Sequence, residues 1–77
     1  MVTIEIRAIQ RSRVLRMRID EDICVAKLCD GIRHILKDTT PGLLISCEDQ
    51  GMLSSEMSIS KYGIRTGSVL IYISKIA

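Results

Sequence analysis

The strongest constraint on the fold is an apolar run near the carboxyl end of the chain. Residues 69–73, VLIYI, carry no polar group other than the tyrosine hydroxyl. A strand of this composition cannot lie at an exposed sheet edge without inviting aggregation, because its unpaired backbone groups would template pairing with other chains. We therefore expect residues 68–74 to form a central strand, inserted between the first and the third strand of a sheet.

The beginning of the chain predicts a β-hairpin. Residues 2–8 alternate between apolar and polar side chains, which is typical of a strand with one buried face. After a short polar turn, residues 14–20 resume the alternation, with Arg16 and Arg18 on the polar face and Leu15, Met17 and Ile19 on the apolar one.

The apolar spacing then changes to that of an amphipathic helix. We expect Asp22 to cap its first turn, and we interpret Gly31 as a mark of close packing against the sheet. Pro41 cannot continue a helix and sets its limit. The predicted buried stripe consists of Val25, Leu28, Cys29, Ile32, Ile35 and Leu36.

The remaining segments complete one domain spanning residues 1–77. We predict a third strand at 43–47, a turn at 48–51, a short return strand at 52–55 and a single helical turn at 59–64. Gly67 can take the positive φ of the turn before the last strand. The order ββαβββ predicts an α+β roll with one helix packed across a mixed sheet.

The segment LSSEMSISKYGIRTGSVLIYI carries a resemblance to the end of the ubiquitin fold, with Ile59, Tyr62 and the pair Gly63–Ile64 in matching order. The segments VAKLCDGI and YGIRTGS are most similar to the bacterial YukD/EsaB family, although Ser68 stands where that family usually has Asp. The resemblance covers nearly the whole chain and implies a ubiquitin-like β-grasp.

The resemblance also implies a non-catalytic role. YukD/EsaB proteins are small cytoplasmic accessory or regulatory components of bacterial type VII secretion systems. Conjugated ubiquitin relatives need a flexible diglycine end, whereas this sequence ends in SKIA. The implied function is therefore a protein-binding module that is not conjugated, with secretion-system components as partners.

Residues with catalytic potential are few and do not combine. His34 falls opposite the apolar stripe, Cys29 falls on it, and Cys24 lies near the helix start without an evident base. Glu48 and Asp49 are adjacent turn carboxylates. We therefore expect no enzyme, metal or cofactor. Three cysteines without an export signal favour a cytoplasmic protein with reduced thiols, and no apolar stretch is long enough to span a membrane.

Basic residues concentrate in the first hairpin, which holds Arg7, Arg16 and Arg18 on its polar face. Three interpretations remain open: a solvated face that resists aggregation, a docking site for an acidic protein, or a nucleic-acid site. The net charge of +2 and the absence of interleaved aromatic residues argue against nucleic acid.

The second candidate surface is apolar. If Leu70 and Tyr72 point inward, then Val69, Ile71 and Ile73 point outward, and we expect them to share the open sheet face with Leu44. Such a patch indicates a partner or self-association. In the opposite register these residues are core. Other functions that fit are a small non-catalytic β-grasp subunit of a larger enzyme complex, and a sulfur carrier or modifier with a truncated tail.

Overall fold

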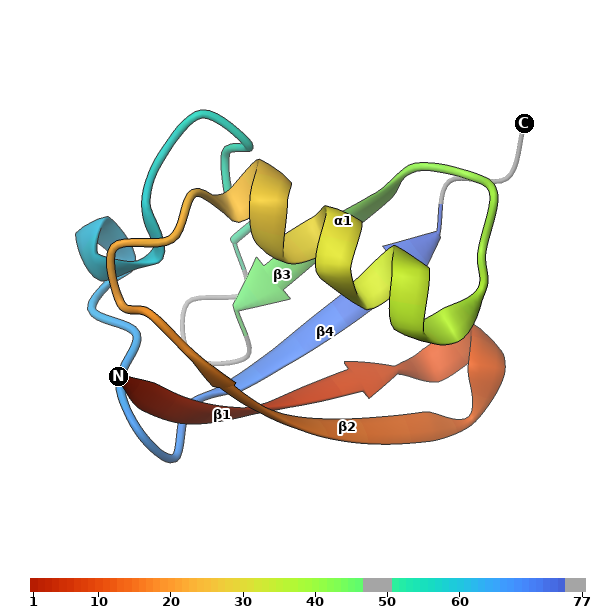
Figure 1. The fold of residues 1–77 in the computed structure, drawn as a ribbon, viewed down its shortest axis with the longest axis horizontal. Coiled ribbons are helices and arrows are strands. Elements are labelled where there is room, and N and C mark those ends of the chain that lie inside the picture. The colour runs from red at the N-terminus through yellow and green to blue at the C-terminus, as the bar shows by residue number, and fades with distance from the viewer. Residues whose placement is uncertain (47–50, 75–77) are drawn as a thin grey trace.

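The computed structural model describes residues 1–46 and 51–74. A four-stranded sheet is crossed on one face by a single helix, α1 (Figure 1). The elements in chain order are β1 (Val2–Ala8), the 3₁₀ turn η1 (Ile9–Arg11), β2 (Arg13–Ile19), α1 (Val25–Leu36), β3 (Gly42–Ser46), the 3₁₀ turn η2 (Ile59–Tyr62) and β4 (Val69–Ser74).

The carboxyl-terminal strand lies at the centre of the sheet, as the sequence predicted. The strand order is β2-β1-β4-β3, with β4 parallel to β1 and antiparallel to β3. The mixed sheet under one crossing helix confirms the predicted α+β roll. Because β4 is paired on both sides, its backbone groups are satisfied and its apolar side chains are not exposed at an edge.

The core lies between the sheet and α1. Alternation along β1 places its even-numbered residues inward, and β4 contributes Leu70 and Tyr72 to the same layer. On α1, the residues buried against the sheet are Val25, Leu28, Ile32 and Leu36. Leu44, Leu53, Ile59 and Ile64 close the core on the side of β3 and the η2 segment.

Four local predictions are wrong. The segment 52–55 is no strand, because only an isolated bridge joins Met52 to Ile45. The cap position of α1 is Cys24, and no side chain caps it; Asp22 instead donates its N–H to the Asp20 carboxylate. Ile35 is 43% exposed and so lies outside the buried stripe. A Cβ at Gly31 would have no neighbour within 4 Å, so this glycine marks no close packing.

Close packing occurs instead at Gly42, the first residue of β3. A Cβ at Gly42 would overlap with Cζ and the hydroxyl oxygen of Tyr72. The Tyr72 side chain is 1% exposed, and its ring cannot swing away into solvent. The tyrosine of the central strand therefore requires a residue without a side chain on the neighbouring strand.

We expect the substitution Gly42→Ala to lower the free energy of unfolding by about 1–3 kcal/mol, because the added methyl group forces the buried ring to move. The matched control is Gly31→Ala, where the methyl group enters open space in the middle of a helix. This control should raise stability, by up to about 1 kcal/mol. Urea denaturation followed by circular dichroism measures both, and equal stabilities for Gly42→Ala and wild type would contradict the packing argument.

Candidate functional site

The face of the sheet opposite α1 divides into two halves. One row of paired residues crosses all four strands in the order Val14, Arg7, Ile71 and Ile45. The β1–β2 half of this face is largely charged, and the β4–β3 half is aliphatic. We call this the open face.

The aliphatic half forms an apolar ridge. Its members are all partly exposed, in contrast to the buried residues that alternate with them: Leu43, Ile45, Val69, Ile71 and Ile73. Val69, Ile71 and Ile73 thus lie on the predicted face. Leu44 does not, because it is 0% exposed and belongs to the core.

The error at Leu44 has a simple cause. Antiparallel register pairs Leu44 with the inward-facing Tyr72, and pairs Leu43 and Ile45 with the outward-facing Ile73 and Ile71. The sequence of β3 is apolar on both sides of the strand, so alternation alone gave no signal for its inward side. Leu43 and Ile45 were therefore missed as members of the ridge.

The charged half contains the three predicted arginines, and all three are exposed. Arg7 contacts Glu5 through an Nε–Oε2 ion pair of 2.8 Å. Arg16 and Arg18 form no ion pair with any residue that the structure describes. Their charges are thus available to a partner. We call Arg7, Arg16 and Arg18 the arginine flank of the ridge.

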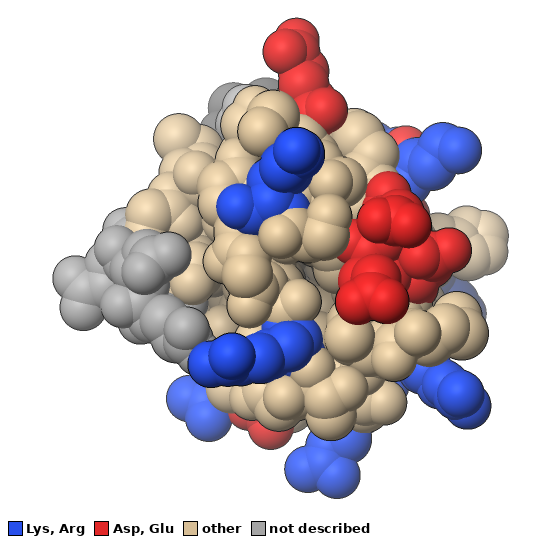
Figure 2. Space-filling view, turned by 90° about the vertical axis from the view of Figure 1, so that its left-hand side faces the viewer, with Lys and Arg blue, Asp and Glu red and all other residues tan. Residues whose placement is uncertain are grey.

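Figure 2 shows how the charges are distributed over one end of the molecule. Several basic side chains project along its lower part, with others in the upper centre and at the upper right, and most of the visible acidic side chains gather in one patch on the right. A depression of about 290 Å³ opens between the arginine flank and the ridge, lined among others by Glu5, Arg16 and Val69. The open face therefore combines an apolar surface, a basic border and a shallow hollow.

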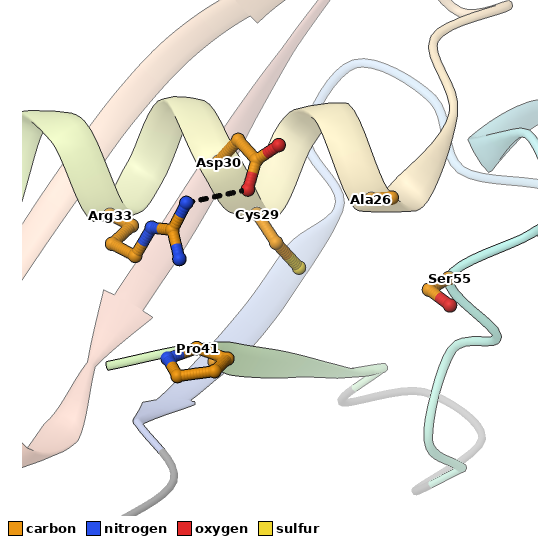
Figure 3. Close-up of a pocket in the computed structure, with 7 residues that line it drawn as sticks. Ala26, Cys29, Asp30, Arg33, Pro41 and Ser55 are labelled. Atoms are coloured by element: carbon orange, nitrogen blue, oxygen red, sulfur yellow. Dashed lines mark hydrogen bonds and ion pairs between the residues drawn. The ribbon is translucent and has the colours of Figure 1, made fainter. Parts of the chain in front are cut away.

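The two cysteines that the structure describes are poorly suited to catalysis. Burial, together with the nearby Asp30 carboxylate, raises the pKa of the Cys29 thiol to about 11. Cys29 points from α1 toward β3 into a cavity of about 150 Å³ (Figure 3), and this cavity also holds the Asp30–Arg33 ion pair of 3.1 Å. The Cys24 thiol donates a hydrogen bond of 2.9 Å to the Ser55 carbonyl oxygen. A protonated thiol is a weak nucleophile.

The other residues with catalytic potential are His34, Glu48 and Asp49. His34 is exposed, and within residues 1–46 and 51–74 no group of three His, Cys, Asp or Glu side chains could hold a metal ion. Cys47, Glu48, Asp49 and residues 75–77 lie outside the described residues. Over the part of the chain that is described, no helix has the length and apolarity to cross a membrane.

A polar cluster fixes the carboxyl end of β4. The Gln10 side chain accepts a hydrogen bond from the Ser74 N–H at 2.6 Å and donates one to the Ser74 carbonyl oxygen at 3.3 Å. The Ser74 hydroxyl donates to Asp38, whose carboxylate also accepts from Thr40 and contacts Arg11 at 3.3 Å. The Ser74 hydroxyl, followed by the Thr40 N–H, holds the pKa of Asp38 well below its usual range.

The fold defined by these elements is the ubiquitin-like β-grasp. No family model matches the chain, and no curated protein matches its sequence. Similar solved structures include the ubiquitin-like domain of Plasmodium falciparum Dsk2, with 16% identity and a TM-score of 0.82 over 96% of this chain and 97% of that chain.

Two designed proteins are similar to the same degree. One, computationally designed on the template of human erythrocytic ubiquitin, has 22% identity and a TM-score of 0.81, covering 100% of this chain and 95% of that chain. Another, designed de novo on the basis of ubiquitin, has 18% identity and a TM-score of 0.80 over 99% and 90% of the two chains. At these identities the likeness shows the fold alone.

We expect the polar cluster around Asp38 to make the free energy of unfolding depend on pH in the acidic range. A carboxyl with a depressed pKa in the folded state stabilises the fold above its unfolded pKa of about 3.9, and this contribution is lost as the pH falls below that value. Asp38→Asn should therefore be less stable than wild type at pH 7 and should lose less stability between pH 6 and pH 3.

Urea midpoints measured across this pH range give the comparison. The matched control is Asp30→Asn, because the Asp30 side chain is 68% exposed and its ion pair with Arg33 is solvated. The control should follow the wild-type pH profile. An Asp38→Asn protein with the wild-type acid sensitivity would contradict the assigned role of the cluster.

Proposed function

We propose that this chain is a non-catalytic protein-binding module that binds its partner through the open face. The observation that carries the proposal is the apolar ridge on the two strands β4 and β3, bordered by the arginine flank. Partly exposed aliphatic side chains gathered on one face of a small domain are typical of an interaction site. Arginine is enriched at protein interfaces because it contacts carboxylates with two parallel hydrogen bonds.

The proposal also states that the chain catalyses no reaction. The raised pKa of the Cys29 thiol and the solvated position of His34 support it, because among the described residues neither has the partner that nucleophilic or acid–base catalysis requires. The ridge supplies apolar contact, and the flank supplies charge for orientation. A partner that fits both carries an apolar strip bordered by acidic residues.

The identity of the partner is proposed from the residue resemblance alone. The segments VAKLCDGI and YGIRTGS support an accessory or regulatory role in a bacterial type VII secretion system, acting in the cytoplasm. A ridge of this kind would equally serve a small non-catalytic subunit of an enzyme complex, and identification of the captured partner distinguishes the two.

We expect Ile71→Thr and Ile45→Thr to weaken binding to the native partner by at least about fivefold each, because each removes apolar contact at the centre of the ridge. Threonine keeps the β-branch that suits a strand. The matched control is Met57→Thr, an exposed apolar residue before η2 and away from the sheet faces used here, which should bind like wild type. Affinity capture from the source organism, quantified by mass spectrometry, identifies the partner and compares the variants.

One outcome would count against the open face, and another would identify its occupant as a second copy of this chain. Capture of the same partner by the ridge variants and by wild type, with all proteins folded by circular dichroism, removes the ridge as the binding site. Size-exclusion chromatography with light scattering addresses self-association: a wild-type dimer that Ile71→Thr dissociates would identify a second copy as the occupant.

The secretion role has its own test. We expect deletion of the gene to reduce export of type VII substrates, and reintroduction of the wild-type gene to restore it. The Ile71→Thr gene should restore less than the Met57→Thr gene. Unaltered export in the deletion strain would refute the secretion role while leaving the binding proposal standing.

A further inference from the structure

β2 is an edge strand that nothing in the described structure covers. It lies at one end of the strand order and pairs only with β1 (Figure 1). Among the described residues, the backbone of β2 forms no hydrogen bond outside this pairing. The other edge differs, because Leu53 donates to the Leu44 carbonyl oxygen and Ser46 donates to that of Gly51, which covers part of β3.

The register shows which backbone groups of β2 face the free edge. Glu5 donates its N–H to Ser68, and Thr3 accepts from Gly67, so the odd-numbered residues of β1 direct their backbone groups toward β4. The even-numbered residues of β1 therefore pair with the odd-numbered residues of β2. It follows that Val14, Arg16 and Arg18 direct their N–H and carbonyl groups away from the sheet.

The side chains along this edge alternate in character. Arg16 and Arg18 stand exposed on the open face, and Val14 is 62% exposed beside them. Leu15 and Met17 point to the other side of β2, where they pack against the core but stay half-buried. An added strand would thus meet positive charge on one face and partly exposed apolar surface on the other.

The helix leaves room beside this apolar surface. One flank of α1, with Ala26, Cys29 and Arg33, lines a cavity together with Pro41 and Gly42 at the β3 side. Helical geometry places Gly31 and Ile35 on the opposite flank, toward β2. A Cβ at Gly31 would meet nothing within 4 Å, and Ile35 is partly exposed.

We propose that the free edge of β2 binds an extended segment of a partner protein in which acidic residues alternate with apolar ones. The segment pairs with the backbone of Val14, Arg16 and Arg18, its acidic side chains contact the two arginines, and its apolar side chains cover Leu15 and Met17. Backbone hydrogen bonds supply affinity in this mode, and alternate side chains supply specificity. A second copy of β2 is a poor occupant, because pairing two such edges brings arginines together.

This site differs from the ridge, although Arg16 and Arg18 border both. The ridge binds through side chains of β3 and β4, whereas the edge binds through the backbone of β2. A change at Val14 that removes only its outward N–H therefore tests the edge and leaves the ridge intact.

The probe is a capped synthetic peptide, Gly-Val-Glu-Val-Glu-Val-Glu-Gly, titrated into the full chain at low salt. We expect the largest amide chemical-shift changes in β2, and slower hydrogen exchange for the amides of Val14, Arg16 and Arg18 in the complex. A peptide with Lys in place of Glu should not bind. A peptide of the same composition with the valines and glutamates in separate blocks should bind at least about tenfold more weakly.

Two matched variants separate backbone pairing from simple charge attraction. Val14→Pro removes one outward N–H and no pairing with β1, so it should bind the peptide about tenfold more weakly than Val14→Ala, which keeps this N–H. Should Val14→Pro fail to fold, N-methylation of the peptide replaces it. Methyl groups on the amides that face β2 abolish binding, and methyl groups on the alternate amides do not.

Three outcomes would overturn the proposal. The first is equal binding of both N-methylated peptides, which indicates charge attraction without strand pairing. The second is a set of shift changes confined to β3 and β4, which assigns the peptide to the ridge. The third is the absence of any binding at low salt. Capture of the native partner by Ile71→Thr at the wild-type level, together with peptide binding at β2, would refute the open-face proposal and leave this one standing.

Discussion

The structure depends on the pairing of β4 between β1 and β3. This strand joins the two halves of the chain, because β1 belongs to the first hairpin and β3 follows the helix. It places Leu70 and Tyr72 in the core and leaves Val69, Ile71 and Ile73 on the other face. Both its ends are fixed by side chains: Ser68 bonds to Arg65 at the beginning, and Gln10 holds Ser74 at the end. The core and the candidate interface are thus two faces of one strand.

The position of Tyr72 at the centre of the sheet lowers the stability of the core locally. Its ring occupies the space over Gly42, and among the described residues its buried hydroxyl has no hydrogen-bond partner. Burial raises the pKa of this hydroxyl, so the group stays neutral. An unpaired buried hydroxyl destabilises a fold by about 1–3 kcal/mol, and the apolar area that the ring buries offsets this cost. The ridge lies on the reverse side of β4 from this packing contact.

Much of the fold could be predicted because the spacing of apolar residues along the sequence changes where one secondary-structure element gives way to the next. Alternation gave the hairpin, the 3.6-residue spacing gave the helix, and the uninterrupted apolar run gave the central strand. The errors occur at residues whose burial depends on neighbours from other elements of the fold. Ile35 fits the helical spacing, but it lies at the margin of the buried stripe and stays 43% exposed. Leu44 was assigned to the open face and lies in the core, because β3 is apolar on both faces and alternation does not show which one points inward.

The part of the candidate site on β4 was predictable, because the orientation of one side chain in a strand determines the orientation of its neighbours. Placing Tyr72 inward was enough to place Val69, Ile71 and Ile73 outward, because side chains alternate along a strand. Extending the patch to β3 required the cross-strand register, which no local pattern contains. The outward orientation of the arginines was predictable because the alternation of polar and apolar residues in a hairpin is a strong signal. That Arg16 and Arg18 form no ion pair with any described residue became visible only when the positions of the described acidic residues were known.

The two proposed binding modes share the arginines for a physical reason. Positive charge on β2 discourages edge pairing between copies of this chain, so the same residues that keep the protein from aggregating select acidic partners. Arg7, in the same cross-strand row as Ile71, extends this charge to the ridge. A partner that carries both an acidic extended segment and an apolar strip can engage the edge and the ridge together. The second contact then forms within an existing complex, at an effective concentration set by the length of the connection between the two segments.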